Sequence, residues 1–506
     1  MTNHVVAYSR ENGGRVLILF LLFFLAMYQF VTAGFSTFAI ICMVPFVILM
    51  GYLIFKWGMF AFWLLIIVNY FIQFQNIPTY FIPTSLPNEM LQLLIIGSAI
   101  IDTRQTPHFE RSVNLMFWAI IIWCTYCTLE VFNDTCGLGI NVGSWYVGAR
   151  MMAFQLIYIF LVFSICITSP EILMKYLKVW AILALISAFW TWKQQNLGLT
   201  PAESSFLHGR GSTTHLIQGG TLIRYWSTFS DAANYGCNAA GTAIAFFVLG
   251  ITSKIKKDKI FFILTSILVI KSMFASGTRT ATFCLLAGFM VYIVLSKSIK
   301  IAIPASIVGG ILFSILAFTT IGQGNQQIRR MRSAFDKNDA SSNVRSINKA
   351  TMRKYMQDAP WGIGIGKGLD NVPANNKFRK MATIAPDSEY VFMWLRTGKI
   401  GISVFIFTML MMLGGACYIV MFRLKSSSLI GIGGGLCSAF VSIQLGGYAN
   451  QVLMQYPNCL IFYGGLTIVY LLPYLEPAWI EYEKKQLAEQ EERKRLKLEK
   501  KLASRV

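Results

Sequence analysis

Long apolar runs, separated by short polar loops, recur along almost the whole of this 506-residue chain. A helix needs about 20 mostly apolar residues to cross the hydrocarbon core of a bilayer, and most of these runs approach that length. Apolar residues make up 55% of the chain and charged residues only 13%, whereas soluble domains carry about 25% charged residues. The sequence therefore predicts an all-α, polytopic membrane protein with about 12–14 transmembrane helices, and it excludes most cytosolic enzyme folds.

The run at 90–101 is short for a span, and the run at 391–421 is long and is interrupted by Gly398 and Gly401. We find no internal repeat and no low-complexity linker, so we expect one membrane domain over residues 1–475. The candidate spans are 16–33, 36–55, 57–74, 90–101, 113–132, 152–168, 177–192, 234–253, 260–275, 281–295, 299–321, 391–421, 429–448 and 460–475.

Basic residues in the short loops predict the orientation, because Lys and Arg are enriched on the cytoplasmic side. With the N-terminus inside, both chain ends and all the basic short loops are cytoplasmic. Residues 476–506 then form a charged cytoplasmic helix, which either rests near anionic headgroups or docks a partner enzyme. The basic positions that agree are Lys56, Arg104, Arg111, Lys175, Lys178, Lys254, Lys256, Lys257, Lys297, Lys300, Arg423 and Lys425.

The net charge of +21 indicates anionic partners. Since the charges lie between and beyond apolar spans, we expect membrane lipids and an anionic substrate rather than nucleic acid. Among the ten Cys residues, Cys124 and Cys127 form a single Cys-x-x-Cys pair inside a span with no further Cys or His cluster at zinc-ligand spacing, and only His208 and His215 fall on the outer side. We therefore expect no metal site, no cofactor and no disulfide framework.

Two outer segments, 194–233 and 322–389, are longer than the other loops. The second is a large basic extracytoplasmic loop with twelve Lys and Arg residues, Arg345 among them, and five Asp residues. It is either a soluble basic loop or the site of an anionic substrate at the outer surface. Arg suits the second role because its planar guanidinium binds phosphate oxygens in bidentate fashion and stays charged.

Several charged residues lie where the outer segments meet the membrane. Arg279, in the short link Ser276-Gly277-Thr278-Arg279, stands between two apolar runs, and Arg224 and Arg150 lie just before outer ends of spans. Charges at this depth are costly and are usually functional, although Arg279 could also be a structural residue that reaches the interface. Asp387 and Glu389 stand where the basic loop re-enters the membrane, and Asp387 could alternatively serve as a helix N-cap.

Arginines beside a carboxylate suit group transfer from a pyrophosphate donor. The arginines neutralise the departing pyrophosphate, and the carboxylate takes the proton of the attacking hydroxyl. The glycine-rich stretch Gly362-Ile363-Gly364-Ile365-Gly366 lacks the strand–helix context of a nucleotide loop. We interpret it as a turn that lets the backbone approach another segment, or as a hinge.

An ordered set of motifs resembles the O-antigen ligase/polymerase superfamily. Asp387-Ser388, nine residues and Gly398-Lys399-Ile400-Gly401 are similar to its signature of His, then Asn, Ser or Gln, nine residues and Gly-x-x-small. The segments 276–279, 224–234 and 360–364 resemble its Ser-x-Ser-Arg, Arg-x-x-Gly-x-Phe-x-x-x-Asn and Pro-x-Gly-x-Gly elements, and Arg345 stands at the upstream Arg position.

The resemblance implies a multispanning enzyme of the bacterial inner membrane, without metal or nucleotide and of inverting stereochemistry. Its donor would be a glycan on undecaprenyl pyrophosphate, and its acceptor another glycan or the lipid A core of lipopolysaccharide, on the periplasmic side. Carried over, Arg279, Arg224 and Arg345 would bind pyrophosphate, Asp387 would be the catalytic base, and Glu389 and Arg150 would support them. Because Asp387 replaces the ligases' His, a polysaccharide polymerase is favoured over a ligase, and a lipid-linked oligosaccharide flippase is the alternative.

Overall fold

The computed structural model describes residues 59–77, 85–101, 109–217, 222–296 and 340–503, except 369 and 385, together with isolated residues elsewhere. The expected spans 16–33, 36–55 and 299–321 and the basic residues Arg104, Lys297 and Lys300 lie outside these ranges.

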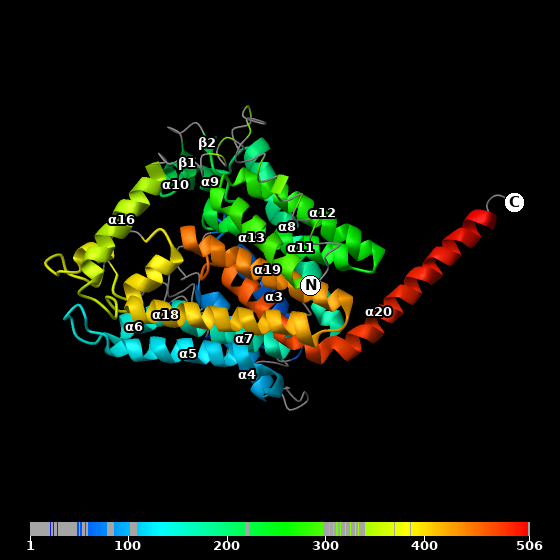
Figure 1. Cartoon of the computed structure of the whole chain (residues 1–506), viewed down its shortest axis with the longest axis horizontal. Coiled ribbons are helices and arrows are strands. Elements are labelled where there is room, and N and C mark those ends of the chain that lie inside the picture. The colour runs from blue at the N-terminus through cyan, green and yellow to red at the C-terminus, as the bar shows by residue number, and fades with distance from the viewer. Residues whose placement is uncertain are drawn as a thin grey trace.

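The described chain is a bundle of helices with one two-residue hairpin (Figure 1). Seven helical stretches are long and apolar enough to cross a membrane, and α3, α4 and α13 are shorter apolar helices. This confirms the predicted all-α, polytopic membrane fold. The helices are α3 (Phe60–Phe71), α4 (Ser85–Ile101), α5 (Leu115–Leu129), α6 (Val142–Ala149), α7 (Gln155–Cys166), α8 (Pro170–Asn196), α9 (Pro201–His208), α10 (Ser212–His215), α11 (Ala232–Thr252), α12 (Lys256–Ala275), α13 (Arg279–Leu295), α16 (Ala340–Met356), α17 (Arg379–Thr383), α18 (Glu389–Tyr418), α19 (Ser427–Ala449) and α20 (Gly464–Ala503).

Short irregular pieces complete the described chain. The strands β1 (Leu216–Ile217) and β2 (Leu222–Ile223) pair antiparallel. Two 3₁₀ turns flank α5, and three π-helical turns lie within or at the ends of spans. The turns are η1 (Phe109–Ser112), η2 (Glu130–Phe132), η3 (Arg150–Phe154), η5 (Ile419–Arg423) and η6 (Cys459–Tyr463).

Two helices begin well before the apolar runs that predicted them. The helix expected at 177 begins at Pro170, because Ser169 caps it and proline suits the first helical turn. The helix expected at 152 begins at Val142 and passes through η3 without ending. Hydropathy locates the membrane-crossing part of a helix, but capping residues decide where the helix starts.

Helices α11 and α19 form the centre of the bundle, with most of their residues buried. Glycines let neighbouring helices approach closely, as is common in membrane proteins. A Cβ on Gly241 of α11 would lie 3.3 Å from the carbonyl oxygen of Ala439 in α19, and one on Gly446 of α19 would lie 3.1 Å from Cys237 Sγ in α11. The α11–α19 contact therefore depends on small residues as well as on apolar area.

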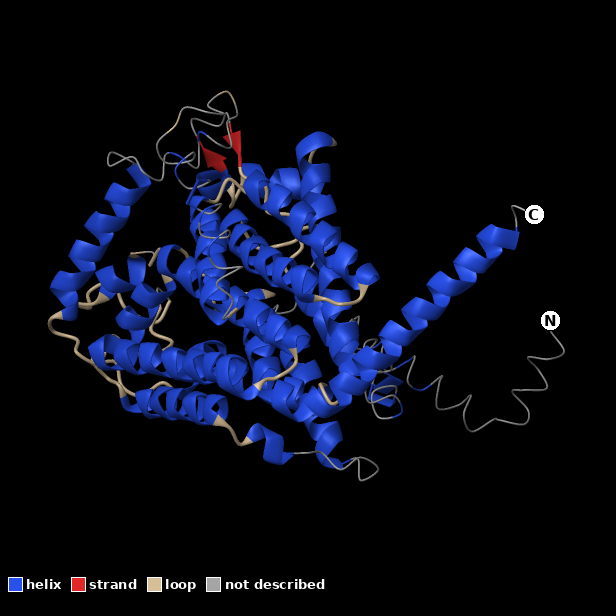
Figure 2. Ribbon diagram, turned by 45° about the vertical axis from the view of Figure 1, so that its right-hand side comes forward, coloured by secondary structure: helices blue, strands red, loops and turns tan. Residues whose placement is uncertain are grey.

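Helix α20 runs from the bundle into the charged tail without a break, and its C-terminal half extends away from the bundle (Figure 2). Where α20 leaves, Lys254 Nζ lies 2.7 Å from Glu483 and Lys178 Nζ lies 2.8 Å from Asp258. We call this the tail end of the bundle and the opposite end the site end. The basic short loops around Lys178 and Lys254 therefore gather at the tail end.

Candidate active site

Arg224 joins the loop before α11, in which it lies, to the link between α12 and α13, which ends at Arg279. Its guanidinium donates from Nε to the carbonyl of Ser276 at 3.3 Å, from Nη1 to the carbonyl of Thr214 at 3.0 Å and from Nη2 to Thr278 Oγ1 at 3.0 Å. Arg279 follows directly as the first residue of α13 and is half-buried. The link between α12 and α13 is thus built around Arg224, which also has a structural role.

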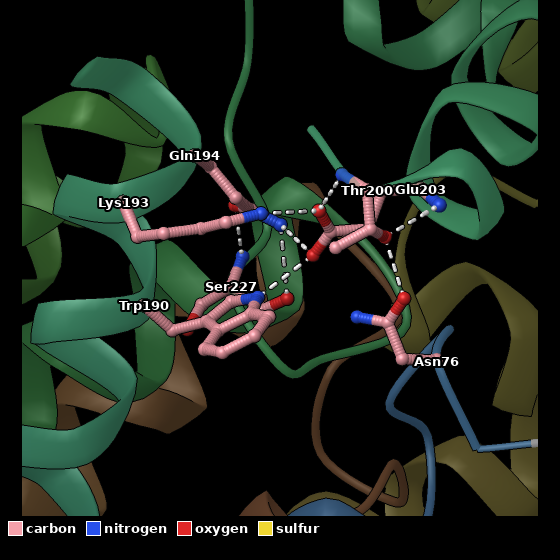
Figure 3. Close-up of polar contacts among 7 residues, drawn as sticks. All are labelled: Asn76, Trp190, Lys193, Gln194, Thr200, Glu203 and Ser227. Atoms are coloured by element: carbon pink, nitrogen blue, oxygen red, sulfur yellow. Dashed lines mark hydrogen bonds and ion pairs between the residues drawn. The ribbon is translucent and has the colours of Figure 1, made fainter. Parts of the chain in front are cut away.

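A buried carboxylate, that of Glu203, joins α9 to the end of α8 (Figure 3). Glu203 is fully buried and accepts from Trp190 Nε1 at 2.7 Å and from Gln194 Nε2 at 2.9 Å. Burial raises its pKa, but hydrogen bonds, first from the Thr200 backbone, and the charge of Lys193 outweigh this and hold the pKa below its ordinary value.

Gln194 extends the same network to the loop after Arg224. The backbone N–H of Ser227 donates to Gln194 Oε1 at 3.0 Å, and Gln194 Nε2 donates to the Ser227 carbonyl at 3.2 Å. Ser227 has a φ of 58°, which is unfavourable for a residue with a side chain. These hydrogen bonds therefore hold the loop in one conformation.

His215 has a structural role in the outer segment that carries Arg224. Its Nε2 accepts the backbone N–H of Ala232 at 3.2 Å, and its Nδ1 lies 3.1 Å from the carbonyl of Gly211. Burial, followed by the charge of Arg224, lowers the pKa of His215 to about 4, so the imidazole is neutral. Its imidazole ring packs against the ring of Trp226, with 4.8 Å between the two ring centroids.

Helix α18 is broken at Gly398, where φ is 70° and ψ is −166°. The break frees carbonyls that a membrane helix would otherwise bond internally. The Ile363 N–H donates to the carbonyl of Leu395 and the Gly364 N–H to that of Arg396, both at 3.0 Å. Tyr126 Oη donates to the Thr397 carbonyl at 2.9 Å. The glycine-rich turn and α5 therefore supply the hydrogen-bond donors for the carbonyls that are freed at the break.

The glycines of this turn are required by close backbone contact. A Cβ on Gly398 would lie 2.0 Å from the carbonyl oxygen of Pro360, and one on Gly366 would lie 2.0 Å from that of Ser144. Of the two interpretations of the turn, the structure shows the first, close approach, with α18 and α6 as the segments approached. The Pro-x-Gly-x-Gly and Gly-x-x-Gly motifs are thus two halves of one contact.

The basic outer segment folds into a layer with its own small core. Helix α16 stands apart from the main bundle at the site end (Figure 1). Its Met352 and Met356 are anchored in an apolar cluster, whereas the turns before them carry Arg345 and Lys349 on the side of Met352. The cluster comprises Cys136, Met352, Met356, Ala359, Ile363, Val372, Phe378, Met381 and Leu395.

Asp387 and Arg345 line one cavity of about 430 Å³ between α16 and the ends of α18 and α19. Lys349 lines the same cavity, and Asp387 is exposed in it. The N-cap position of α18 belongs to Ser388, whose Oγ donates to the carbonyl of Gly447 at 3.1 Å. The alternative that Asp387 is the N-cap is therefore wrong. We call this space the Asp387 cavity.

Arg279 lies at the same level along the helix axes as the Asp387 cavity, but it does not line the cavity. Helices α13 and α19 run antiparallel, and a Cβ on Gly288 would lie 3.2 Å from the carbonyl oxygen of Ser438. Arg279 precedes Gly288 by nine residues and Gly447 follows Ser438 by nine, so both lie about 13 Å from this contact along the helices. Among the described residues, Arg345 is the one of the three expected pyrophosphate ligands that lines this cavity.

Glu389 and Arg150 line a second cavity, of about 530 Å³, which we call the Glu389 cavity. Arg150 donates to Glu89 at 3.2 Å and to Ser85 Oγ at 3.0 Å, and the buried Glu389 accepts the Leu453 N–H at 3.1 Å. Arg396 also lines this cavity and is not among the site residues predicted from the sequence. Its charge inside the apolar run 391–421 was the available signal.

Residues 261–406 match the family model described as O-antigen ligase. The matched segment runs from α12 into α18 and includes Arg279, Arg345 and Asp387. No curated protein matches the chain. The match over residues 261–406 supports the resemblance of this multi-pass membrane protein to the O-antigen ligase/polymerase superfamily.

Proposed function

We propose that the protein is a membrane glycosyltransferase that transfers or polymerises oligosaccharide linked to undecaprenyl pyrophosphate on the periplasmic face of the bacterial inner membrane. A polysaccharide polymerase is favoured over an O-antigen ligase. The observation that carries the proposal is the Asp387 cavity, where a carboxylate and two cationic side chains face one space inside the segment that matches the family. The proposal keeps both chain termini on the cytoplasmic side.

In the proposed reaction, the acceptor hydroxyl attacks the anomeric carbon of the donor sugar, and Asp387 takes the hydroxyl proton. The bond from that carbon to the pyrophosphate oxygen breaks, undecaprenyl pyrophosphate leaves, and the configuration inverts. Arg345, with Arg279 and Arg224 nearby on the site end, compensates the developing negative charge. Glu389 and Arg150 support the acceptor side, and no metal takes part.

The replacement of the family's usual His by Asp387 supports a polymerase, whose acceptor is another glycan rather than lipid A core. The charged end of α20 projects from the opposite end of the bundle and is available to partners of a polysaccharide-assembly complex (Figure 2). The two ends of the molecule would then have separate roles in catalysis and in recruitment.

The test is transfer by the purified full-length protein in nanodiscs, supplied with a repeat unit on undecaprenyl pyrophosphate. We expect a ladder of products, and Asp387→Asn should abolish it. Asp358→Asn is the matched control, because Asp358 lies in the same outer segment, is exposed and pairs with Lys377.

A single transfer to added lipid A core, without a ladder, would identify a ligase instead. Movement of the lipid-linked repeat across a bilayer without any transfer would contradict the proposal and favour the flippase. Wild-type ladders from Asp387→Asn would remove Asp387 from the mechanism.

A further inference from the structure

We propose that the Glu389 cavity binds a sugar that carries a carboxylate, and that Arg396 is the specificity-determining residue that pairs with it. This inference rests on the proposed function, because it names the class of glycan that the enzyme would accept. It concerns the sugar, whereas the diphosphate is assigned to the cations of the site end.

The size and lining of the Glu389 cavity suit a saccharide. Its volume of about 530 Å³ lies within the range of about 300–1,000 Å³ of small-molecule sites. Three amide side chains, Gln73, Gln451 and Gln455, line it together with Tyr456. Amides both donate and accept hydrogen bonds, which sugar hydroxyls require, and an aromatic ring offers an apolar surface to a sugar face.

Arg396 stands in this cavity without a carboxylate partner among the described residues. Its Nη1 is buried and has no hydrogen-bond acceptor, and the guanidinium lies over the ring of Phe392 at 5.3 Å. A buried guanidinium without a counter-charge is unfavourable, so a ligand carboxylate at this position would compensate it. Gly368 leaves room beside it, since a Cβ there would lie 3.9 Å from Nη2.

The charges around the cavity favour one carboxylate over a phosphate. Arg150 is paired with Glu89, at 3.2 Å, so Arg396 and Glu389 are the remaining opposite charges among the described residues of the lining. They lie seven residues apart on α18, about 10 Å along the helix. A sugar between them would place its carboxylate at Arg396 and a hydroxyl or amine at Glu389, whereas a phosphate dianion would bring more charge than Arg396 compensates.

The experiment measures binding of soluble sugars to the detergent-solubilised full-length protein by isothermal titration calorimetry. The probes are digalacturonate with one of its two carboxyl groups methyl-esterified, which therefore carries a single carboxylate and is called digalacturonate below, the uncharged digalactose, and galactose 1-phosphate. We expect digalacturonate to bind at least about tenfold more tightly than digalactose, as one charge-assisted pair provides. Arg396→Gln should bring this ratio close to one, and Lys399→Gln, the exposed basic residue one turn further along α18, should leave it unchanged.

Arg396→Lys keeps the charge and should retain part of the preference, which provides a second variant if Arg396→Gln does not fold. Equal binding of digalacturonate and digalactose to the wild type would overturn the inference, as would an unchanged ratio in folded Arg396→Gln. Tighter binding of galactose 1-phosphate than of digalacturonate would overturn the choice of a carboxylate.

Binding also separates this inference from the proposed reaction. Asp387→Asn should lose transfer and keep the preference for digalacturonate, because Asp387 does not line the Glu389 cavity. If the wild type shows the preference but transfers no glycan to any acceptor, the proposed function fails and the acidic-sugar site stands.

Discussion

Arg224 Nη2 donates to Thr278 Oγ1 at 3.0 Å, and Thr278 Oγ1 in turn donates to the carbonyl of Ala232 at 2.7 Å. The loop before α11 and the link between α12 and α13 are therefore one hydrogen-bonded unit. An arginine that the sequence suggests as a phosphate ligand is also the residue that positions Arg279. Its substitution should change stability as well as activity.

Replacing Arg224 with Gln should lower the free energy of unfolding by about 2–3 kcal/mol, because the carbonyls of Thr214 and Ser276 lose a charged donor. Thermal unfolding of the purified protein measures this loss. Arg210→Gln, on the exposed surface of the same outer segment, should have a much smaller effect. Equal melting temperatures for the two variants would refute the structural role of Arg224.

Replacing Gly398 with Ala should strongly reduce the yield of folded protein. The new Cβ would lie 2.0 Å from the carbonyl oxygen of Pro360, and φ at this position is 70°. Strain and overpacking together cost about 2–6 kcal/mol. Gly414→Ala on the same helix is the control, because nothing lies within 4 Å of its Cβ position, and it should leave the yield unchanged or raise it. Size-exclusion chromatography after membrane extraction measures both.

Acidification should destabilise the site end through His215. Its pKa is lowered to about 4 in the folded protein, first by burial, whereas an exposed imidazole has a pKa near 6.5. Between these values the unfolded chain binds a proton that the folded one does not, so stability falls as the pH drops through this window, by up to about 3 kcal/mol in total.

Unfolding midpoints from pH 7.5 to 4.5 test this dependence. His215→Gln should be less stable at pH 7.5 but should lose less on acidification. His208→Gln, which changes an exposed imidazole in the same segment, should keep the wild-type slope. A slope in His215→Gln as steep as in the wild type would assign the pH dependence to other groups.

Substituting Arg345 and Lys349 together with Gln should reduce glycan transfer at least about a hundredfold, because both cations face Asp387 across one cavity. Arg353→Gln and Lys354→Gln, combined, change two exposed cations on the same helix without touching the cavity, and should transfer at near wild-type rates. Equal losses from both double substitutions would indicate a general effect of the basic layer rather than a site.

Much of the fold was predictable because the bilayer restricts a polytopic chain to helices of a certain length. The spans around 113–132 and 429–448 follow from composition alone, and helices occur there. The starts of α8 at Pro170 and of the helix at Val142 did not follow, since Ser169 and Asn141 cap those helices in polar sequence that hydropathy ignores.

The candidate site could be predicted from the sequence only in part, for a related reason. Residue type and order marked Arg224, Arg279, Arg345 and Asp387, because charges at a membrane boundary are rare. Their grouping depends on contacts between segments far apart in the chain, such as Ser388 with Gly447 and Arg150 with Glu89. Asp387 and Glu389 are two positions apart in the chain, yet they line different cavities.

The sequence by itself determined that the chain crosses a membrane in helices and that its motifs resemble those of the O-antigen ligase family, because hydropathy, charge and motif spacing are local properties. Only the tertiary structure decided that Arg224 is hydrogen-bonded into the scaffold, that the glycine-rich turn donates hydrogen bonds to carbonyls at the break in α18, and that Arg396 Nη1 has no hydrogen-bond partner among the described residues. Each of these depends on which distant backbone or side-chain group lies opposite, and packing alone determines that.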